Sequence, residues 1–365
     1  MISWGILGTG YAAGRFADGL KSVRGARLMA VGSRRQSSAR QFAGLLAVPR
    51  AYASYSELIR DKDIDVVYIA TPNSSHRDLS LYCLNAGKAV LCEKPFTLNH
   101  AQAREVVDLA RRKHLFCMEA MWTRFLPVMR DVRKLIDNRD IGDVQLLIAG
   151  IGHAVHADAQ SRFFNRALGG GALLDLGVYG ISLACHLLGE PSRVTGRAIL
   201  GPTGVDEQCS VILEYAKGQL AAITASLRTQ GPNEAVVMGT NGRLRIHEPL
   251  ICPYRISLEK LQGQTVQSPS APRWRSIISR SAVLRRLWLA LNAVGRVKTT
   301  VRSFRGNGYN YEAQEVVRCL ESGKTESELM PLDGTIGVMK ILDDARQQWG
   351  LSYPGEHCQM SPNVN

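Results

Sequence analysis

The sequence predicts a two-domain α/β protein, in which a doubly wound parallel sheet is followed by an α+β domain with an open, mainly antiparallel sheet. Three observations lead to this prediction. The first 120 residues alternate short apolar strands with helical segments, and a glycine-rich turn follows the first strand. Strand-like segments then follow one another closely from about residue 193 to residue 261, with no helix between them. The length of 365 residues is long for one hydrophobic core and suits two domains.

The N-terminal domain is predicted to span residues 1–121. Its repeated βα units require right-handed crossovers and therefore a parallel, doubly wound sheet. Ser54 precedes Glu57 by three residues, which is the pattern of a capping box at a helix start. Asn99 is expected to be the N-cap of a helix that runs through Lys113. The predicted strands are 2–7, 27–32, 65–70, 89–92 and 115–118.

The second domain is predicted to span residues 122–354. A helix near 126–138 and a strand near 144–150 precede three consecutive glycines, which begin a long helix to about Leu188. Closely spaced strands without intervening helices pair antiparallel, so we expect an open sheet with helices on one face. The strands are 193–200, 208–215, 219–227, 235–239, 243–247 and 254–261, and the closing helices are 311–322 and 332–349. Residues 355–365 are predicted to be a flexible tail.

Composition argues against several classes of protein. Hydrophobic residues make up 45% of the chain and charged residues 21%, as in soluble globular proteins. No run of 18 apolar residues predicts a membrane-spanning helix, and the N-terminus lacks the pattern of a secretory signal. The eight cysteines lack the paired spacing of metal sites. We therefore expect reduced thiols, no bound metal and a cytoplasmic protein.

The net charge of +13 is concentrated in one segment. Residues 265–306 contain nine basic residues and no acidic residue, which leaves +4 for the rest of the chain. The apolar positions from Ile277 to Val294 have helical spacing. Two interpretations stay open: an insertion that packs on its own protein as a lid or oligomer contact, and a contact with an anionic membrane surface or an acidic partner. No nucleic-acid-binding motif accompanies the charge, so we expect no nucleic-acid partner.

The turn after the first strand has the pattern of a dinucleotide-binding site. Gly8, Thr9, Gly10, Tyr11 and Ala12 follow a strand, open a helix and lie within a βαβ unit. Glycines let the backbone approach a pyrophosphate, and the free amides and the dipole at a helix N-terminus favour the anion. A tight turn between packed elements is the alternative, but the strand–turn–helix context favours a Rossmann dinucleotide site.

The end of the second predicted strand indicates which dinucleotide is bound. A site that prefers NAD usually places Asp or Glu here, to bind the ribose 2′-hydroxyl. This chain has Ser33, Arg34 and Arg35 instead, and a hydroxyl with two guanidiniums suits a 2′-phosphate. The sequence therefore favours NADP over NAD. The alternative is that both arginines lie on the surface without a ligand.

Two further strands end in polar residues at the edge of the sheet where ligands bind. The loop after the third predicted strand is expected to contact the nicotinamide ribose, and it contains Thr71, Pro72, Asn73 and His76. For His76, a helix N-terminal residue with a local hydrogen bond is an equal alternative, so it is assigned to contact and not to catalysis.

Glu93 and Lys94 follow the fourth predicted strand and are assigned to the same cofactor site. At this position the ammonium of Lys94 points at the ligand. A cation beside the reactive end of a dinucleotide indicates a dehydrogenase.

The helix after the triple glycine contains two polar residues among apolar ones. Asp175 and Tyr179 are four residues apart and are expected to share one helix face. Burying them without partners would be costly, and the glycines permit close approach of another surface. These two residues are therefore candidates for the chemistry of the site. A buried Tyr–Asp hydrogen bond that joins the domains is the alternative.

Together these motifs resemble the Gfo/Idh/MocA oxidoreductases, the family of glucose–fructose oxidoreductase and inositol dehydrogenase. The resemblance rests on the glycine-rich turn, residues 70–73, residues 86–95 and the triple-glycine helix. Residues 119–125 and 204–207 are most similar to the branch of dimeric dihydrodiol dehydrogenases and NADP-dependent xylose dehydrogenases. The basic segment departs from the family, because relatives have a short connection there.

The resemblance implies an NADP-dependent enzyme that transfers a hydride between nicotinamide C4 and a CH–OH or C=O carbon of a sugar or cyclic diol. Tyr179 would be the general acid/base, and Lys94 would lower its pKa and polarise the substrate oxygen. Asp175 would bind a substrate hydroxyl or orient Lys94. Pro95 would fix the backbone of the lysine, through a bond whose cis or trans state the sequence leaves open.

The resemblance also implies a substrate wall and an assembly. Aromatic faces suit sugar rings and cyclic diols, and the candidates for the wall are Trp122, Arg124, Phe125 and Arg162. A homo-oligomer would form through the sheet of the second domain. Two other functions stay open. One is a non-catalytic dinucleotide-responsive regulator of the same fold, which the presence of all three catalytic candidates disfavours. The other is a nucleotide-sugar or ketosugar oxidoreductase of a glycan pathway.

Overall fold

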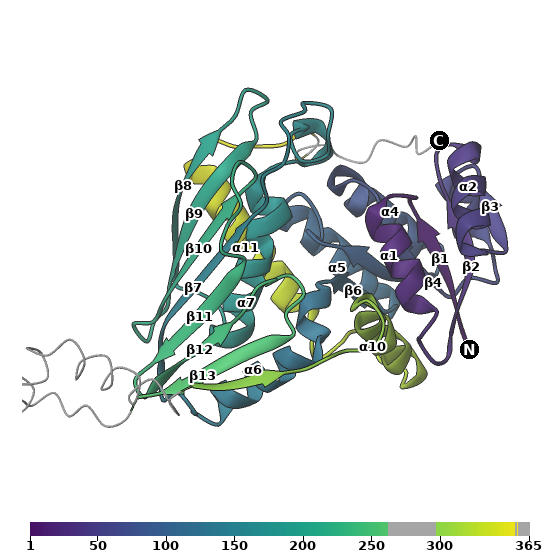
Figure 1. Ribbon diagram of the computed structural model, residues 1–365. Coiled ribbons are helices and arrows are strands. Elements are labelled where there is room, and N and C mark those ends of the chain that lie inside the picture. Colours follow the sequence, from purple (N-terminus) through teal and green to yellow (C-terminus); the bar gives the residue numbers. More distant parts are fainter. Residues whose placement is uncertain (262–296, 355, 357–365) are drawn as a thin grey trace, which may run out of the picture.

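The first domain is built on a six-stranded parallel sheet in the order β3-β2-β1-β4-β5-β6 (Figure 1). The computed structural model describes residues 1–261, 297–354 and 356. The order reverses between β1 and β4, so a crevice lies beyond the carboxyl ends of these strands, as the predicted doubly wound fold requires. The strands are β1 (Ile2–Leu7), β2 (Ala26–Gly32), β3 (Arg50–Tyr52), β4 (Val66–Ile69), β5 (Ala89–Glu93) and β6 (Cys117–Ala120).

Helices cover both faces of this sheet, and for that reason every residue of β4 and β5 is buried. Both predicted helix caps are confirmed: the Ser54 side chain accepts from the Glu57 amide, and the Asn99 side chain accepts from the Gln102 amide. The sequence did not reveal β3, an edge strand of three residues. The helices are α1 (Tyr11–Leu20), α2 (Gln36–Leu46), α3 (Tyr55–Arg60), α4 (His76–Asn85) and α5 (His100–Lys113).

The second domain contains an eight-stranded sheet in the order β14-β13-β12-β11-β7-β10-β9-β8. All neighbouring pairs are antiparallel except β10 with β7, which are parallel because the chain returns to β7 after a helix and two further strands. The mainly antiparallel sheet is therefore confirmed. Its strands are β7 (Val144–Gly152), β8 (Arg193–Leu200), β9 (Asp206–Glu214), β10 (Leu220–Ser226), β11 (Glu234–Gly239), β12 (Gly242–Ile246), β13 (Arg255–Lys260) and β14 (Val297–Val301).

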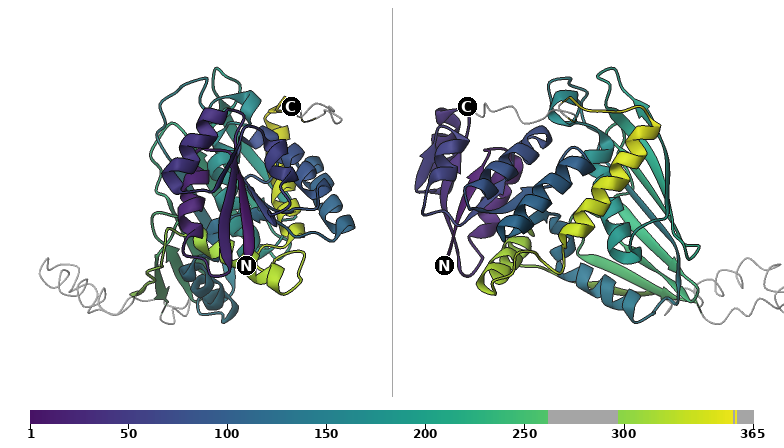
Figure 2. Two further views of the ribbon diagram at one scale, coloured as in Figure 1. Left: turned by 90° about the vertical axis from the view of Figure 1, so that its right-hand side faces the viewer. Right: turned by 180° about the vertical axis from the view of Figure 1, so that it is seen from behind.

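Helices lie only on the face of this sheet that is turned toward the first domain, as far as the described residues go (Figure 2). Helix α10 packs against α1 of the first domain, although the predicted boundary placed it in the second. Gly19 of α1 allows this contact, since a Cβ there would lie 2.7 Å from the Asn307 side chain. The helices of the second domain are α6 (Pro127–Asp137), α7 (Val178–Leu188), α10 (Tyr309–Glu321) and α11 (Leu332–Gln348).

The basic segment 265–306 was expected to be one insertion, but its end forms β14, which extends the sheet beside β13. The apolar positions between Ile277 and Val294 lie outside the described residues.

The segment Arg166–Leu188 is long and apolar enough to span a membrane, although the sequence contains no uninterrupted run of 18 apolar residues. Its most apolar window is 83% buried inside the protein, so this composition reflects packing in the core.

Candidate active site

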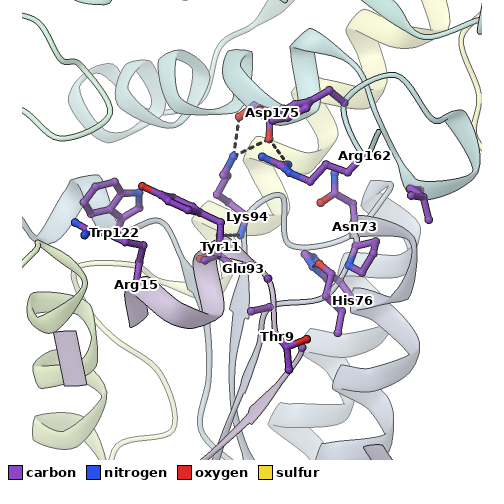
Figure 3. A pocket seen from close by; sticks show the side chains of 18 of the residues that line it. Thr9, Tyr11, Arg15, Asn73, His76, Glu93, Lys94, Trp122, Arg162 and Asp175 are labelled. Atoms are coloured by element: carbon purple, nitrogen blue, oxygen red, sulfur yellow. Dashed lines mark hydrogen bonds and ion pairs between the residues drawn. The ribbon is translucent and has the colours of Figure 1, made fainter. Parts of the chain in front are cut away.

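A cavity of about 750 Å³ lies between the two domains, at the crevice beyond β1 and β4. Its volume is within the range of small-molecule and cofactor sites. The first domain contributes the ends of its parallel strands, and the second contributes the triple-glycine helix and the loops that face it (Figure 3).

The glycine-rich turn forms the floor of this cavity, with Thr9, Tyr11 and Ala12 also lining it. Gly8 has a φ of +105°, and a Cβ there would lie 2.5 Å from the Ala70 carbonyl oxygen, so the turn requires glycine. Gly10 is the N-cap of α1, and apart from its immediate chain neighbours no atom lies within 4 Å of the position that a Cβ would take. The open space beside free helix amides fits the pyrophosphate of a dinucleotide.

Ser33, Arg34 and Arg35 line one end of the cavity, together with Ser38 and Tyr55. Ser33 is buried, whereas both arginines are exposed. Burial raises the pKa of the Tyr55 phenol, although a hydrogen bond and the charge of Arg34 act against that rise. Neither guanidinium has a carboxylate partner among the described residues, so both are available to an anion at this end of the site.

The loop after β4 joins the two domains. Asn73 Nδ2 donates to the carbonyl oxygen of Gly169 over 2.8 Å, and both Thr71 and Pro72 line the cavity. His76 also borders the cavity, but its two ring nitrogens lie 2.8 Å and 2.9 Å from the carbonyl oxygens of Pro95 and Thr71. His76 therefore holds two cofactor-side loops together and offers no free nitrogen to a ligand.

The ammonium of Lys94 lies beside Asp175 of the second domain (Figure 3). Its Nζ donates to the Asp175 carbonyl oxygen over 2.7 Å and lies 3.3 Å from Oδ1. Arg162 donates to the same Oδ1 over 2.8 Å. Burial opposes ionisation of Asp175, but the charges of Lys94 and Arg162 outweigh it and lower the pKa of the carboxyl. Asp175 is thus a buried carboxylate held between two cations.

The surroundings of Lys94 keep it charged. Burial has the largest single effect and lowers its pKa, but the charges of Asp175, Tyr179 and Glu93 together raise it by more, so the net pKa of the ammonium is raised. The peptide bond between Lys94 and Pro95 is cis, which settles the state that the sequence left open. Glu93 also lines the cavity; it accepts from the Tyr68 hydroxyl and, over 3.2 Å, from the amide of Lys94. Burial raises the pKa of the Glu93 carboxyl.

Tyr179 faces Lys94 across the cavity. The ammonium lies 4.7 Å from the centre of the phenol ring, and Trp122 Nε1 donates to the phenol oxygen over 3.3 Å. Burial raises the pKa of Tyr179, and Lys94 lowers it by less, so the net pKa lies above its ordinary value. Lys94 does lower the pKa of the phenol, as expected, but burial has the larger effect and decides the net direction. At neutral pH the group is a phenol, which is suited to donating a proton.

The helix that carries these residues is less regular than predicted. A π-helical turn (Leu173–Gly177) precedes α7, so Asp175 and Tyr179 are not on one face of a regular α-helix. π-helical turns are rare and occur frequently at functional sites. Here the turn carries the residue that presents both its carboxylate and its main-chain carbonyl to Lys94.

Of the predicted substrate wall, only Trp122 and Arg162 line the cavity. Arg124 points away and donates to the side chain and the carbonyl oxygen of Ser182 in α7. Phe125 is fully buried in the core. Arg124 points away because Trp122–Phe125 forms a 3-10 turn, in which successive residues point about 120° apart, so Arg124 cannot face the surface that Trp122 faces.

Several lining residues carried no signal in the sequence. Tyr309 stacks on Trp122 with ring centres 4.6 Å apart, although 187 positions separate them. Arg15 lines the cavity from α1, and its carbonyl oxygen accepts from Asn307. The substrate side is otherwise mainly apolar, with Val155, Phe163, Leu168, Leu176, Leu227, Pro249 and Ile251. These side chains come from segments that are distant in sequence, and no local pattern predicts where they meet.

Comparison with known proteins agrees with this geometry. Residues 2–121 match the model of an oxidoreductase family with an NAD-binding Rossmann fold, and residues 129–245 match the Gfo/Idh/MocA C-terminal domain. A trans-1,2-dihydrobenzene-1,2-diol dehydrogenase from Xenopus laevis is 34% identical over 96% of this chain and 99% of its own. The chain belongs to the Gfo/Idh/MocA oxidoreductase family. The human dihydrodiol dehydrogenase is 32% identical over 97% of this chain and 98% of its own.

Solved structures show the same fold. A 3-ketoreductase from Actinomadura kijaniata, in complex with NADP and TDP-benzene, has a TM-score of 0.79 at 21% identity and covers 95% of this chain and 97% of its own. Levoglucosan dehydrogenase, in complex with NADH and L-sorbose, has a TM-score of 0.79 at 18% identity and covers 96% of both chains. Membership of this oxidoreductase family, with all three catalytic candidates at one cavity, sets aside the non-catalytic regulator.

Proposed function

We propose that this oxidoreductase uses NADP to interconvert a hydroxyl and a carbonyl group on a small cyclic diol. One observation carries the proposal: Lys94 of the first domain and Asp175 and Tyr179 of the second converge in one cavity, above a glycine turn shaped for a dinucleotide. The dinucleotide would be held by the amides of the glycine turn, by the loop of residues 71–73 and by the arginines after β2.

When bound, the nicotinamide would be the acceptor or the donor of the hydride. In the direction of reduction, the Tyr179 phenol donates its proton to the carbonyl oxygen of the substrate as the hydride reaches the carbon. The Lys94 ammonium stabilises the negative charge that develops on that oxygen and then on the phenolate. Asp175 holds the ammonium in place through its carbonyl oxygen and its carboxylate. In the direction of oxidation the same groups act in reverse, with the phenolate accepting the proton.

The apolar substrate side favours a ring with few hydroxyl groups. Among the described loop residues beyond residue 121, the polar side chains that line the cavity are His153, Arg162 and Asn307. A pentose or hexose would leave several hydroxyls without partners against the apolar residues, which costs binding energy. A cyclic vicinal diol needs fewer partners, and the relatives named dihydrodiol dehydrogenases support this class of substrate. A sugar or ketosugar is the second candidate.

The test is turnover of a panel of cyclic trans-diols, aldoses and ketosugars, followed by NADPH fluorescence. We expect the highest kcat/KM with a cyclic diol or its oxidised form. Activity with sugars alone would refute the substrate class, and tight NADPH binding without turnover of any compound would refute the enzymatic proposal.

Cofactor preference is tested by replacing the arginines after β2. A charge-assisted hydrogen bond contributes about 1.5–3 kcal/mol, so Arg34→Ala or Arg35→Ala should weaken NADPH binding roughly tenfold or more and leave NADH binding unchanged. Arg40→Ala, which removes an exposed arginine from α2 outside the cavity, is the matched control. Equal loss for both dinucleotides would contradict the assignment of NADP.

We also propose a cytoplasmic homo-oligomer. The free cysteines among the described residues support a reducing compartment. The face of the second sheet away from the helices carries an apolar row across neighbouring strands, in which Ile212 and Ile148 are each 45% exposed on either side of Ala222. A second copy would cover this row. Light scattering should show that Ile148→Lys lowers the oligomeric state and that Leu45→Lys, on exposed α2, does not.

A further inference from the structure

We propose that Asp206 is a positioning residue for this active site: its buried carboxylate caps the π-helical turn that carries Asp175 and thereby places Asp175 against Lys94. The inference rests on the proposed function. Asp206 is the first residue of β9, is fully buried and does not line the cavity, so it acts through the turn and not on the substrate.

The capping contact is direct. The amide of Leu173, the first residue of the π-helical turn, donates to Asp206 Oδ2 over 2.7 Å. Ala172, the residue in the N-cap position, has no side chain that can accept this bond. The first amides of a helix need an acceptor, and a carboxylate is the strongest one because it also interacts favourably with the helix dipole. Asp206 therefore supplies from a distant strand the cap that the local sequence lacks.

The third glycine of the triplet makes room for this carboxylate. Gly171 has a φ of +126°, and a Cβ there would lie 2.2 Å from Asp206 Oδ1. The carbonyl oxygen of Gly171 accepts from the amide of Asp175 over 3.1 Å, so the residue against which Asp206 packs also begins the hydrogen bonding of Asp175. The carboxylate thus lies beside Gly171, just before the π-helical turn, and accepts from the amide of Leu173, the first residue of that turn.

A second side chain, that of Tyr353, binds the glycine triplet that precedes this turn. The Tyr353 hydroxyl donates to the carbonyl oxygen of Gly170 over 2.6 Å. Arg346 of α11 lies 4.9 Å from the centre of the Tyr353 ring and pairs with Glu356 over 2.6 Å. The segment near the C-terminus is thereby fixed against the glycine triplet, and Tyr353 does not line the cavity.

The groups around Asp206 predict how its charge depends on pH. Burial raises the pKa of the Asp206 carboxyl to about 7, although the Leu173 amide and the charge of Arg346 act against that rise. Cys209 of β9 and Tyr353 are the other titratable groups that face it. As the pH falls through about 7 the carboxyl takes up a proton, and the cap loses the charge that strengthens it.

Two variants of Asp206, with a matched control and a replacement variant at Tyr353, test the proposal in the full chain. At pH 8, Asp206→Asn keeps an acceptor without the charge and should lower kcat about threefold, whereas Asp206→Ala should lower it at least tenfold. Both should leave the Kd of NADPH, measured by fluorescence, within twofold of the wild type. The kcat of the wild type should fall between pH 8 and pH 6, and that of Asp206→Asn should not change.

Glu207→Gln is the control, because it removes a buried charge from the next residue, which pairs with Arg228 over 3.0 Å and not with the turn. It should leave kcat unchanged. A kcat for Asp206→Ala within twofold of this control would overturn the proposal. If Asp206→Ala does not fold, Tyr353→Phe takes its place; it should lower kcat about threefold without changing NADPH affinity, and an unchanged kcat would equally overturn the positioning by this cluster.

Hydrogen exchange of the peptide that contains Leu173 separates this inference from the proposed function. Its amide should exchange at least tenfold faster in Asp206→Asn or Asp206→Ala than in Glu207→Gln, whether or not the protein turns over any compound. If the wild type is inactive with the whole panel, faster exchange supports the cap while the function fails, and unchanged exchange overturns the cap.

Discussion

Replacing Lys94 by methionine removes the ammonium from the site while keeping most of the length of the side chain. The Nζ lies 4.7 Å from the centre of the Tyr179 ring, and we take this distance as the separation between the ammonium and the negative charge that develops beside the phenol. At an effective dielectric constant of about 20, two unit charges at this separation interact by about 3.5 kcal/mol. That energy corresponds to a rate factor of roughly 400, so we expect kcat to fall by about 10²–10³-fold.

The fold should survive this change, because Arg162 still pairs with Asp175 over 2.8 Å. The assay is steady-state turnover with NADPH, together with NADPH affinity by fluorescence and the thermal midpoint. We expect the affinity to stay within a few-fold of the wild type. A Lys94→Met variant that keeps kcat within threefold would refute the reasoning, because the ammonium would then not be stabilising charge in the transition state.

Lys88→Met is the matched control at the other end of the same strand. Lys88 is also buried, but its Nζ donates to the carbonyl oxygens of Asp61 and Ile64, away from the cavity. Losing these bonds leaves the buried Ile64 carbonyl oxygen without this donor, which costs about 1–3 kcal/mol, whereas the Asp61 carbonyl oxygen keeps its bond from the Ile64 amide over 3.3 Å. Lys88→Met should therefore lower the thermal midpoint and leave kcat unchanged, the opposite of what Lys94→Met should do.

Three further predictions concern Tyr179 and the substrate wall. Tyr179→Phe should lower kcat by about 10²–10⁴-fold without changing NADPH affinity, since it removes the proton donor; near-normal turnover would exclude the phenol as the acid. Because burial raises the pKa of Tyr179, the rate of reduction should stay level from about pH 8 to about pH 10 while the rate of oxidation rises, and a fall in reduction over this range would contradict a neutral phenol. Trp122→Ala should raise KM. Arg124→Met should lower the free energy of unfolding by about 2–3 kcal/mol and leave KM unchanged, because the Arg124 guanidinium bonds Ser182 of α7 and not the substrate. A raised KM for Arg124→Met would return Arg124 to the substrate wall.

Much of the fold and several cofactor-side residues could be predicted from local patterns. The N-cap at Asn99 and the need for glycine at position 8 could be predicted, because capping and a positive φ depend on a few neighbouring residues. Lys94 was predictable because its place at the end of a parallel strand decides where its side chain points. The substrate wall was predicted only in part, since the direction of each side chain depends on how a short turn is oriented, and Arg124 faces α7 instead of the cavity.

The sequence by itself determined the order of most strands and helices, the glycine turn and the identity of the polar residues at the strand ends, because periodicity, capping and turn chemistry act over a few residues. Only the tertiary structure decided which groups meet and how they ionise. Tyr179 is a neutral phenol because burial outweighs the charge of Lys94, and that balance exists only once two domains enclose both side chains. Asp206 caps the π-helical turn that carries Asp175 for the same reason: β9 and the glycine triplet become neighbours only in the folded chain.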